Sequence, residues 1–105
     1  MQFKSYFTEG RNRWDQFSVN KGTDRWTFTN LQSSKRYFMK INKSSIYDTL
    51  GSFLRELGAT SGNGGKTRGQ IDHFTFASNL IKGQKNSIFV KSGMFDKIAK
   101  TWKLH

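Results

Sequence analysis

The sequence contains no cysteine and no proline, and it has only seven acidic residues. The absence of cysteine excludes disulfide frameworks and thiolate metal sites, zinc fingers included. No stretch approaches the ~20 apolar residues of a membrane-spanning helix, and the N-terminal residues lack the apolar core of a signal peptide. We therefore expect no membrane partner and no secretion, and an intracellular location such as the cytoplasm, a nucleoid or a nucleus.

Positive charge is what the chain has in excess. Eighteen Lys and Arg give a formal net charge of +11 in 105 residues. Such a charge destabilises the folded state by self-repulsion, and a polyanionic partner explains it better than solubility does. Ten Phe, three Trp and three Tyr accompany the cations, often within one or two positions. Because rings stack on unpaired bases while cations hold phosphates, the composition favours a nucleic acid as partner.

The first forty residues alternate short β-like runs with polar turns. They predict four strands, at residues 3–8, 13–19, 25–31 and 35–41. The turns are too short for parallel crossovers, so we expect an antiparallel meander. A helix should follow, because apolar residues recur at helical spacing: Ile46, Leu50, Phe53, Leu54 and Leu57. Ser45 is the expected N-cap, and Gly58 the left-handed residue that ends the helix.

Five glycines between positions 58 and 69 predict a mobile loop at about residues 59–70. Residues 71–78 and 86–91 are then expected as strands, and residues 94–104 as a second helix capped by Ser92. The predicted fold is one α+β domain over residues 1–105, with an antiparallel sheet of about four to six strands. Two helices cover one face of that sheet, and the element order is ββββα-ββα.

Strand alternation predicts a sheet with two different faces. The expected inner residues are Phe3, Phe7, Phe17, Val19, Trp26, Phe28, Tyr37, Met39 and Ile41. The other face would carry rings for stacking, namely Tyr6, Trp14 and Phe38, and cations for phosphates, namely Lys4, Arg13, Arg25, Arg36 and Lys40. Lys66 and Arg68, in the predicted loop, would hold the bound nucleic acid against this face. The alternative is that the three rings are core residues beneath a helix or at a dimer contact.

This pattern predicts a non-catalytic protein that binds single-stranded DNA or RNA. Bases of a duplex are already stacked and cannot use exposed rings. The order of four strands and a helix, over about the first 58 residues, is similar to that of small single-strand-binding domains of the whirly and PUR types. A second basic group, Lys91, Lys97, Lys100 and Lys103, forms a stripe suited to phosphates or an ordinary solvated helix face.

Other functions remain open at this point. A small metal-free ribonuclease, toxin-like, would use His73 as general base with Lys66 or Arg68 beside it. A regulator that binds double-stranded DNA, and a viral or phage factor that binds an acidic host protein, would also use the charge. A homodimer would form if an edge strand were unpaired. Scattered acids predict no metal, no cofactor is expected, and residues 62–67 lack the first glycine of a phosphate-binding loop.

Overall fold

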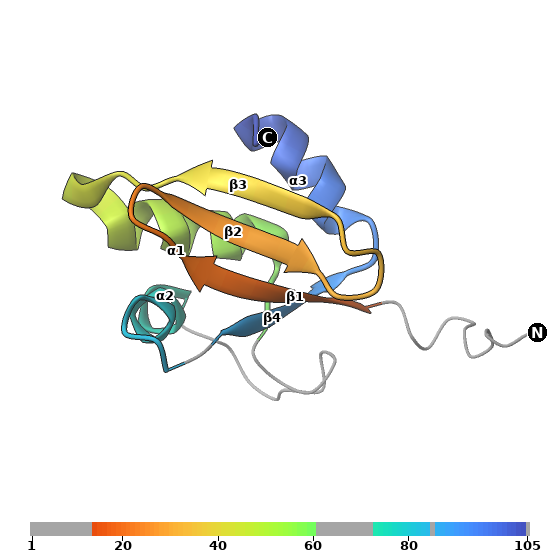
Figure 1. Ribbon diagram of the computed structural model, residues 1–105, viewed down its shortest axis with the longest axis horizontal. Helices are drawn as coiled ribbons and strands as arrows, with labels where there is room; N and C mark the ends of the chain where they lie inside the picture. Colours follow the sequence, from red (N-terminus) through yellow and green to blue (C-terminus); the bar gives the residue numbers. More distant parts are fainter. Residues whose placement is uncertain (1–13, 61–72, 85, 105) are drawn as a thin grey trace, which may run out of the picture.

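The computed structural model describes residues 14–60, 73–84 and 86–104. Four strands form one antiparallel sheet: β1 (Trp14–Lys21), β2 (Arg25–Asn30), β3 (Arg36–Lys40) and β4 (Ser87–Lys91). Their order is β3-β2-β1-β4, so β4 comes from the far end of the described chain and pairs with β1 (Figure 1). The predicted α+β class and the antiparallel sheet are confirmed. The strands predicted at residues 13–19, 25–31 and 35–41 correspond to β1, β2 and β3. The strand expected at residues 3–8 lies outside the described residues.

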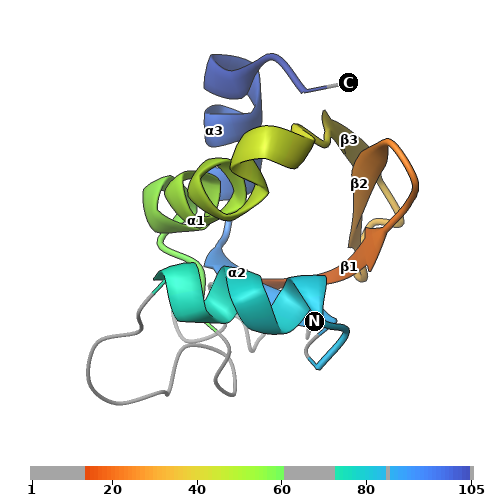
Figure 2. The ribbon, with the colours of Figure 1, turned by 90° about the vertical axis from the view of Figure 1, so that its left-hand side faces the viewer.

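The three α-helices that the structure describes pack on the same face of the sheet. They are α1 (Ile46–Leu57), preceded by the short 3-10 helix η1 (Lys43–Ser45), α2 (His73–Ile81) and α3 (Met94–Trp102). Figure 2 shows α1, α2 and α3 on one side of β1, β2 and β3. None of the elements that the structure describes covers the opposite face.

The core is the inner face of the sheet packed against these helices. In the strands the alternation is as predicted: Phe17, Val19, Trp26, Phe28, Tyr37 and Met39 are buried, and so are Ile88 and Val90 of β4. The helices contribute Leu50, Phe53, Leu54, Leu57, Phe76, Ala77, Leu80, Phe95 and Ala99. Because the side chains of a strand alternate between two faces, burial of this set leaves every second strand residue on the other face.

Phe95, in the first turn of α3, is the centre of an aromatic group in this core. Its ring centroid lies 4.1 Å from that of Phe17, 4.6 Å from Tyr37, 5.5 Å from Phe28 and 5.7 Å from Phe53. Each buried ring removes roughly 150–250 Å² from water, and such ring pairs add to this burial. The aromatic group therefore joins three strands, α1 and α3 in a chain with few aliphatic residues.

The ends of α1 follow the sequence closely. Ser45 occupies the N-cap position, although its hydroxyl is 3.2 Å from the Thr49 hydroxyl and makes no capping bond to the backbone. Gly58 ends the helix with φ of +67°, and its N–H donates to the carbonyls of Arg55 and Leu54. Of the loop predicted at about residues 59–70, the structure describes the first two residues: Ala59 is buried, and Thr60 pairs with Phe89 of β4 through two backbone hydrogen bonds of 2.9 Å. The rest of that loop lies outside the described residues.

The strand predicted at residues 71–78 was wrong, because α2 occupies most of it. Phe76, Ala77 and Leu80 are buried on one face of α2, a helical spacing that continues beyond the expected strand. Helix α2 packs closely on α1 where Gly51 has no side chain; a Cβ there would lie 2.6 Å from Cδ1 of Phe74. Tertiary packing thus selected a helix where the local residues also suit a strand.

The second predicted helix is confirmed as α3, but its expected cap is not. Gly93, with φ of +81°, takes the N-cap position in place of Ser92. At the other end, Trp102 donates its indole N–H to Oε1 of Glu56 over 3.0 Å, which links α3 to α1. Among the described residues the covered face therefore carries three α-helices, one more than expected.

Candidate functional site

The side of the sheet that no described element covers is here called the open face, and the register of the four strands defines it. Its residues are Trp14, Gln16, Ser18 and Asn20 of β1; Arg25, Thr27 and Thr29 of β2; Arg36, Phe38 and Lys40 of β3; and Ser87, Phe89 and Lys91 of β4. This set contains three aromatic rings, four cations and no acid. Such a composition provides flat surfaces for stacking within a positive field.

One corner of the open face, the Phe38 corner, consists of Phe38, Arg25 and Lys40. Arg25 and Lys40 are directly paired across β2 and β3, and Phe38 is paired with Thr27. The guanidinium carbon of Arg25 lies 4.2 Å from the centroid of the half-buried Phe38 ring. This distance is within the range of a cation–π contact, so the ring holds the positive charge of Arg25 at this corner.

The opposite corner, the Trp14 corner, consists of Trp14, Phe89 and Lys91. Trp14 is paired with Lys91, and Phe89 with Gln16, so Trp14 and Phe89 are diagonal neighbours on one face. Diagonal neighbours lie about 7–8 Å apart at their backbones, within reach of aromatic side chains. Both rings are half-buried and Lys91 is exposed. This corner therefore also combines rings with a cation.

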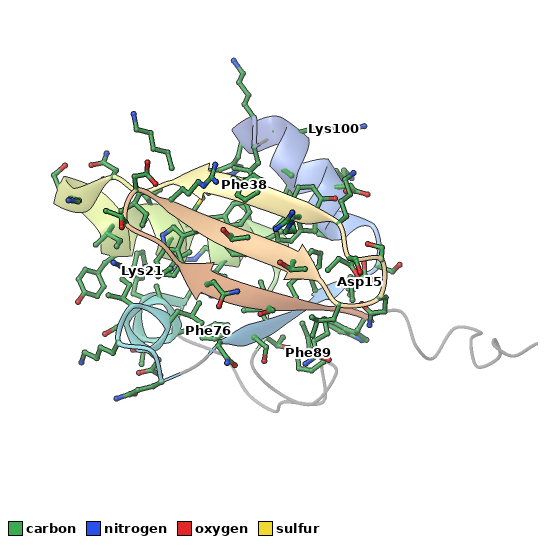
Figure 3. The ribbon with its side chains drawn as sticks, in the orientation of Figure 1. Asp15, Lys21, Phe38, Phe76, Phe89 and Lys100 are labelled. Atoms are coloured by element: carbon green, nitrogen blue, oxygen red, sulfur yellow. The ribbon has the colours of Figure 1, made fainter. Side chains whose placement is uncertain are left out.

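Short polar side chains separate the two corners. Ser18, Thr29 and Ser87 are in register across the middle of the sheet, and Arg36 continues that row at the β3 edge. A strand rise of about 3.3 Å and a strand spacing of about 4.8 Å place the Phe38 and Trp14 corners about 20 Å apart. Figure 3 shows Phe38 and Phe89 near opposite edges of the sheet. The open face thus carries its aromatic rings in two separate corners.

The described part of the predicted site lies on one face of the sheet, divided between its two corners. Trp14, Arg25, Arg36, Phe38 and Lys40 all lie on the open face, and neither Trp14 nor Phe38 is among the fully buried residues. The remaining predicted residues lie outside the described residues: Lys4, Tyr6, Arg13, Lys66 and Arg68.

Sequence reasoning missed Phe89 and misplaced Lys91. Lys91 belongs to the open face beside Trp14, not to a stripe along α3. Alternation in β4 was the available signal, because Ile88 and Val90 face the core and so direct Phe89 and Lys91 outward. Including both residues completes the Trp14 corner.

The other lysines of the predicted stripe, Lys97, Lys100 and Lys103, are exposed at α3. Lys100 differs from Lys97 in its surroundings, because it lines a hollow of about 350 Å³ between β3 and α3. Lys35 and Arg36 of the β3 end also line this hollow. The stripe is therefore divided between two surfaces.

The structure describes the surroundings of His73, the candidate general base of the ribonuclease alternative. This residue begins α2, and its Nε2 is buried without a hydrogen-bond partner among the described residues. A general base has to come within hydrogen-bond reach of its substrate, and a buried nitrogen is not offered to a substrate in this state. Within residues 14–60, 73–84 and 86–104, no group of three His, Asp or Glu side chains could hold a metal ion.

Comparison of the chain with protein-family models, with curated proteins and with solved structures found no match. Among the helices that the structure describes, none has the length and apolarity needed to cross a membrane. The function is therefore argued from the open face itself.

Proposed function

We propose that this protein binds single-stranded nucleic acid on the open face of its sheet and carries out no chemistry on it. The observation that supports this most is the composition of that face: the rings of Trp14, Phe38 and Phe89, four cations and no acid. Unpaired bases stack on exposed rings for about 1–3 kcal/mol each, and neighbouring cations neutralise phosphates.

The shape of the site favours a single strand over a duplex. Its rings belong to sheet strands, and half-buried rings at a sheet surface can reach only bases that are unstacked and turned toward the protein. In a duplex the bases are stacked on each other, and a protein reads their edges from the grooves instead. The described helices lie on the other side of the sheet (Figure 2). We therefore expect the single-stranded nucleic acid to run across the open face of the sheet.

The cations give the binding a measurable electrostatic signature. Arg25, Arg36, Lys40 and Lys91 lie on the open face, which provides four contacts to phosphates. For single strands the logarithm of affinity falls by about 0.7 per contact for each tenfold increase in salt, so the expected slope is about −3. A protein that used only stacking would show a slope near zero.

The test is a titration of purified protein with labelled single-stranded DNA, single-stranded RNA and duplex DNA, each at two salt concentrations. We expect both single strands to bind more tightly than the duplex, with the salt slope given above. Tighter binding of the duplex would overturn the single-strand assignment. Competition by an acidic polypeptide as effective as the unlabelled strand would instead indicate a protein partner, and cleavage of the RNA would indicate a nuclease.

A further inference from the structure

The hollow between β3 and α3 continues the open face around the edge of the sheet. It is lined by Lys35, Arg36, Tyr37, Asp96, Ala99, Lys100 and Leu104, and its volume is about 350 Å³. Arg36 belongs both to this hollow and to the open face. In Figures 1 and 3, α3 and the labelled Lys100 lie beyond the β3 edge. A chain that crosses the sheet toward β3 would therefore meet the hollow next.

The charges of the hollow are unevenly compensated. Asp96 accepts a hydrogen bond from the Tyr37 hydroxyl, and its Oδ1 lies 3.6 Å from Nζ of Lys35. Lys35 is also held over the Tyr37 ring, 5.1 Å from the centroid. Among the described residues, neither Arg36 nor Lys100 takes part in an ion pair. Two cations from different elements thus remain to receive an anion.

The chemistry of these two cations suits a phosphate group. The planar guanidinium of Arg36 can donate two parallel hydrogen bonds to phosphate oxygens, and the ammonium of Lys100 can neutralise the remaining charge. Ala99 and Leu104 supply an apolar wall on the α3 side. The volume is at the lower end of the range for pockets that hold small organic groups, so a nucleotide unit would fit.

We propose that this hollow is a phosphate subsite for the strand bound on the open face, where the strand turns over the β3 edge onto α3. This inference rests on the proposed function and specifies the path of the bound nucleic acid beyond the open face. The phosphate that leaves the sheet is held between Arg36 and Lys100, and the sugar or base beside it contacts Ala99 and Leu104.

The chain offers a matched pair of variants for the test. Lys100→Gln removes the subsite lysine, whereas Lys97→Gln makes the same charge change one turn earlier on α3, outside the hollow. Both side chains are exposed, so both variants should fold like the wild type, which thermal unfolding would check. With a ten-nucleotide single strand, Lys100→Gln should weaken binding about five- to tenfold and reduce the salt slope by about 0.7, the value for one lost phosphate contact. Lys97→Gln should change the affinity less than twofold.

If the two variants weakened binding equally, the overall positive potential of the protein would explain the loss without a local subsite. This result would overturn the subsite while leaving the proposed function intact. Absence of strand binding by the wild type would overturn both proposals. A second arm titrates adenosine monophosphate and follows the methyl signals of Ala99 and Leu104 by NMR. Two results together would overturn the subsite in favour of a site for free nucleotides. These are saturation of the methyl signals at micromolar adenosine monophosphate, and unchanged binding of the single strand by Lys100→Gln.

Discussion

Arg25 and Phe38, on neighbouring strands, form a cation–π contact on the open face, with the guanidinium carbon 4.2 Å from the ring centroid. Through this contact the guanidinium is held beside the ring at the sheet surface. RNA-binding proteins stack unpaired bases on aromatic rings and on arginine planes alike. The pair therefore offers stacking and charge in one place.

Arg25→Lys tests whether the plane of the guanidinium matters beyond its charge. Lysine keeps the positive charge but has no flat group to stack on. We expect affinity for a single strand to fall about two- to fivefold, which corresponds to about 0.5–1 kcal/mol for the lost contact. The salt slope should stay the same, because the number of phosphate contacts is unchanged. Arg25→Gln is the comparison, and it should reduce both the affinity and the slope; a reduced slope in Arg25→Lys would contradict the stacking role.

Phe38→Ala separates binding from folding when it is compared with Phe28→Ala. The two residues lie on neighbouring strands but on opposite faces, since Phe28 is paired with Tyr37 and is 0% exposed. Phe38→Ala should weaken strand binding about fivefold to a hundredfold, from about 1–3 kcal/mol per stacked base, with little change in Tm. Phe28→Ala should destabilise the fold by about 3–5 kcal/mol. Severe unfolding of Phe38→Ala in a thermal scan would show that this ring belongs to the core.

Much of this arrangement could be predicted from the sequence, for a physical reason. In β1, β2 and β3 the alternation of apolar and polar residues has one solution, because a shift by one residue would bury Arg25 and Arg36 and expose Phe28. The stripe of α1 is equally restrictive, with Leu50, Phe53, Leu54 and Leu57 on one side. Where the sequence pattern permits only one structure, the observed structure agrees with the prediction.

The sequence was ambiguous where two patterns coexist. In residues 71–78 the rings of Phe74 and Phe76 alternate with polar residues as in a strand, yet Phe76, Ala77 and Leu80 also form one helical face. The contact of α2 with α1 decides between them, and that contact is not visible in a local window. The spatial regrouping of Lys91 with Trp14, and of Lys100 with Arg36, similarly depends on strand pairing between distant segments.

Trp14 provides an optical test of its own corner. Of the other tryptophans, Trp26 is buried in the core and Trp102 lies on α3 with its indole N–H bonded to Glu56. A base stacked on Trp14 should therefore quench part of the fluorescence of the protein when a single strand is added. Trp14→Phe should abolish most of that quenching while retaining a ring and most of the affinity. Quenching that persists in Trp14→Phe and disappears in Trp102→Phe would place the strand elsewhere.

Phe95→Ala tests the aromatic group of the core. The ring contacts Phe17, Tyr37, Phe28 and Phe53, so its removal leaves a cavity between the sheet, α1 and α3. We expect a loss of about 3–5 kcal/mol in the free energy of unfolding, measured by urea denaturation. Lys97→Ala, two residues further along α3 and exposed, is the control and should change stability by less than about 0.5 kcal/mol. If Phe95→Ala lowered the free energy of unfolding by less than about 1 kcal/mol, the ring would not be central to the core.

The separation of the two corners predicts how affinity depends on strand length. The Phe38 and Trp14 corners are about 20 Å apart, which is about six steps of a stacked strand at 3.4 Å per nucleotide and fewer steps of an extended one. A strand too short to span this distance occupies one corner, whereas a longer strand occupies both and gains from the high effective concentration of its second half. In a series of oligonucleotides from two to twelve residues, affinity should therefore rise steeply at about four to seven nucleotides.

Weakening one corner should reduce this step in the length series. Phe89→Ala removes one of the two rings of the Trp14 corner, so the gain in affinity from a three-nucleotide to a ten-nucleotide strand should be smaller for this variant than for the wild type. The three-nucleotide strand itself should bind the variant with at most a twofold change, because it can still use the Phe38 corner. An affinity that increases smoothly with length, with equal effects of Phe89→Ala at every length, would indicate a continuous electrostatic track without two stacking positions.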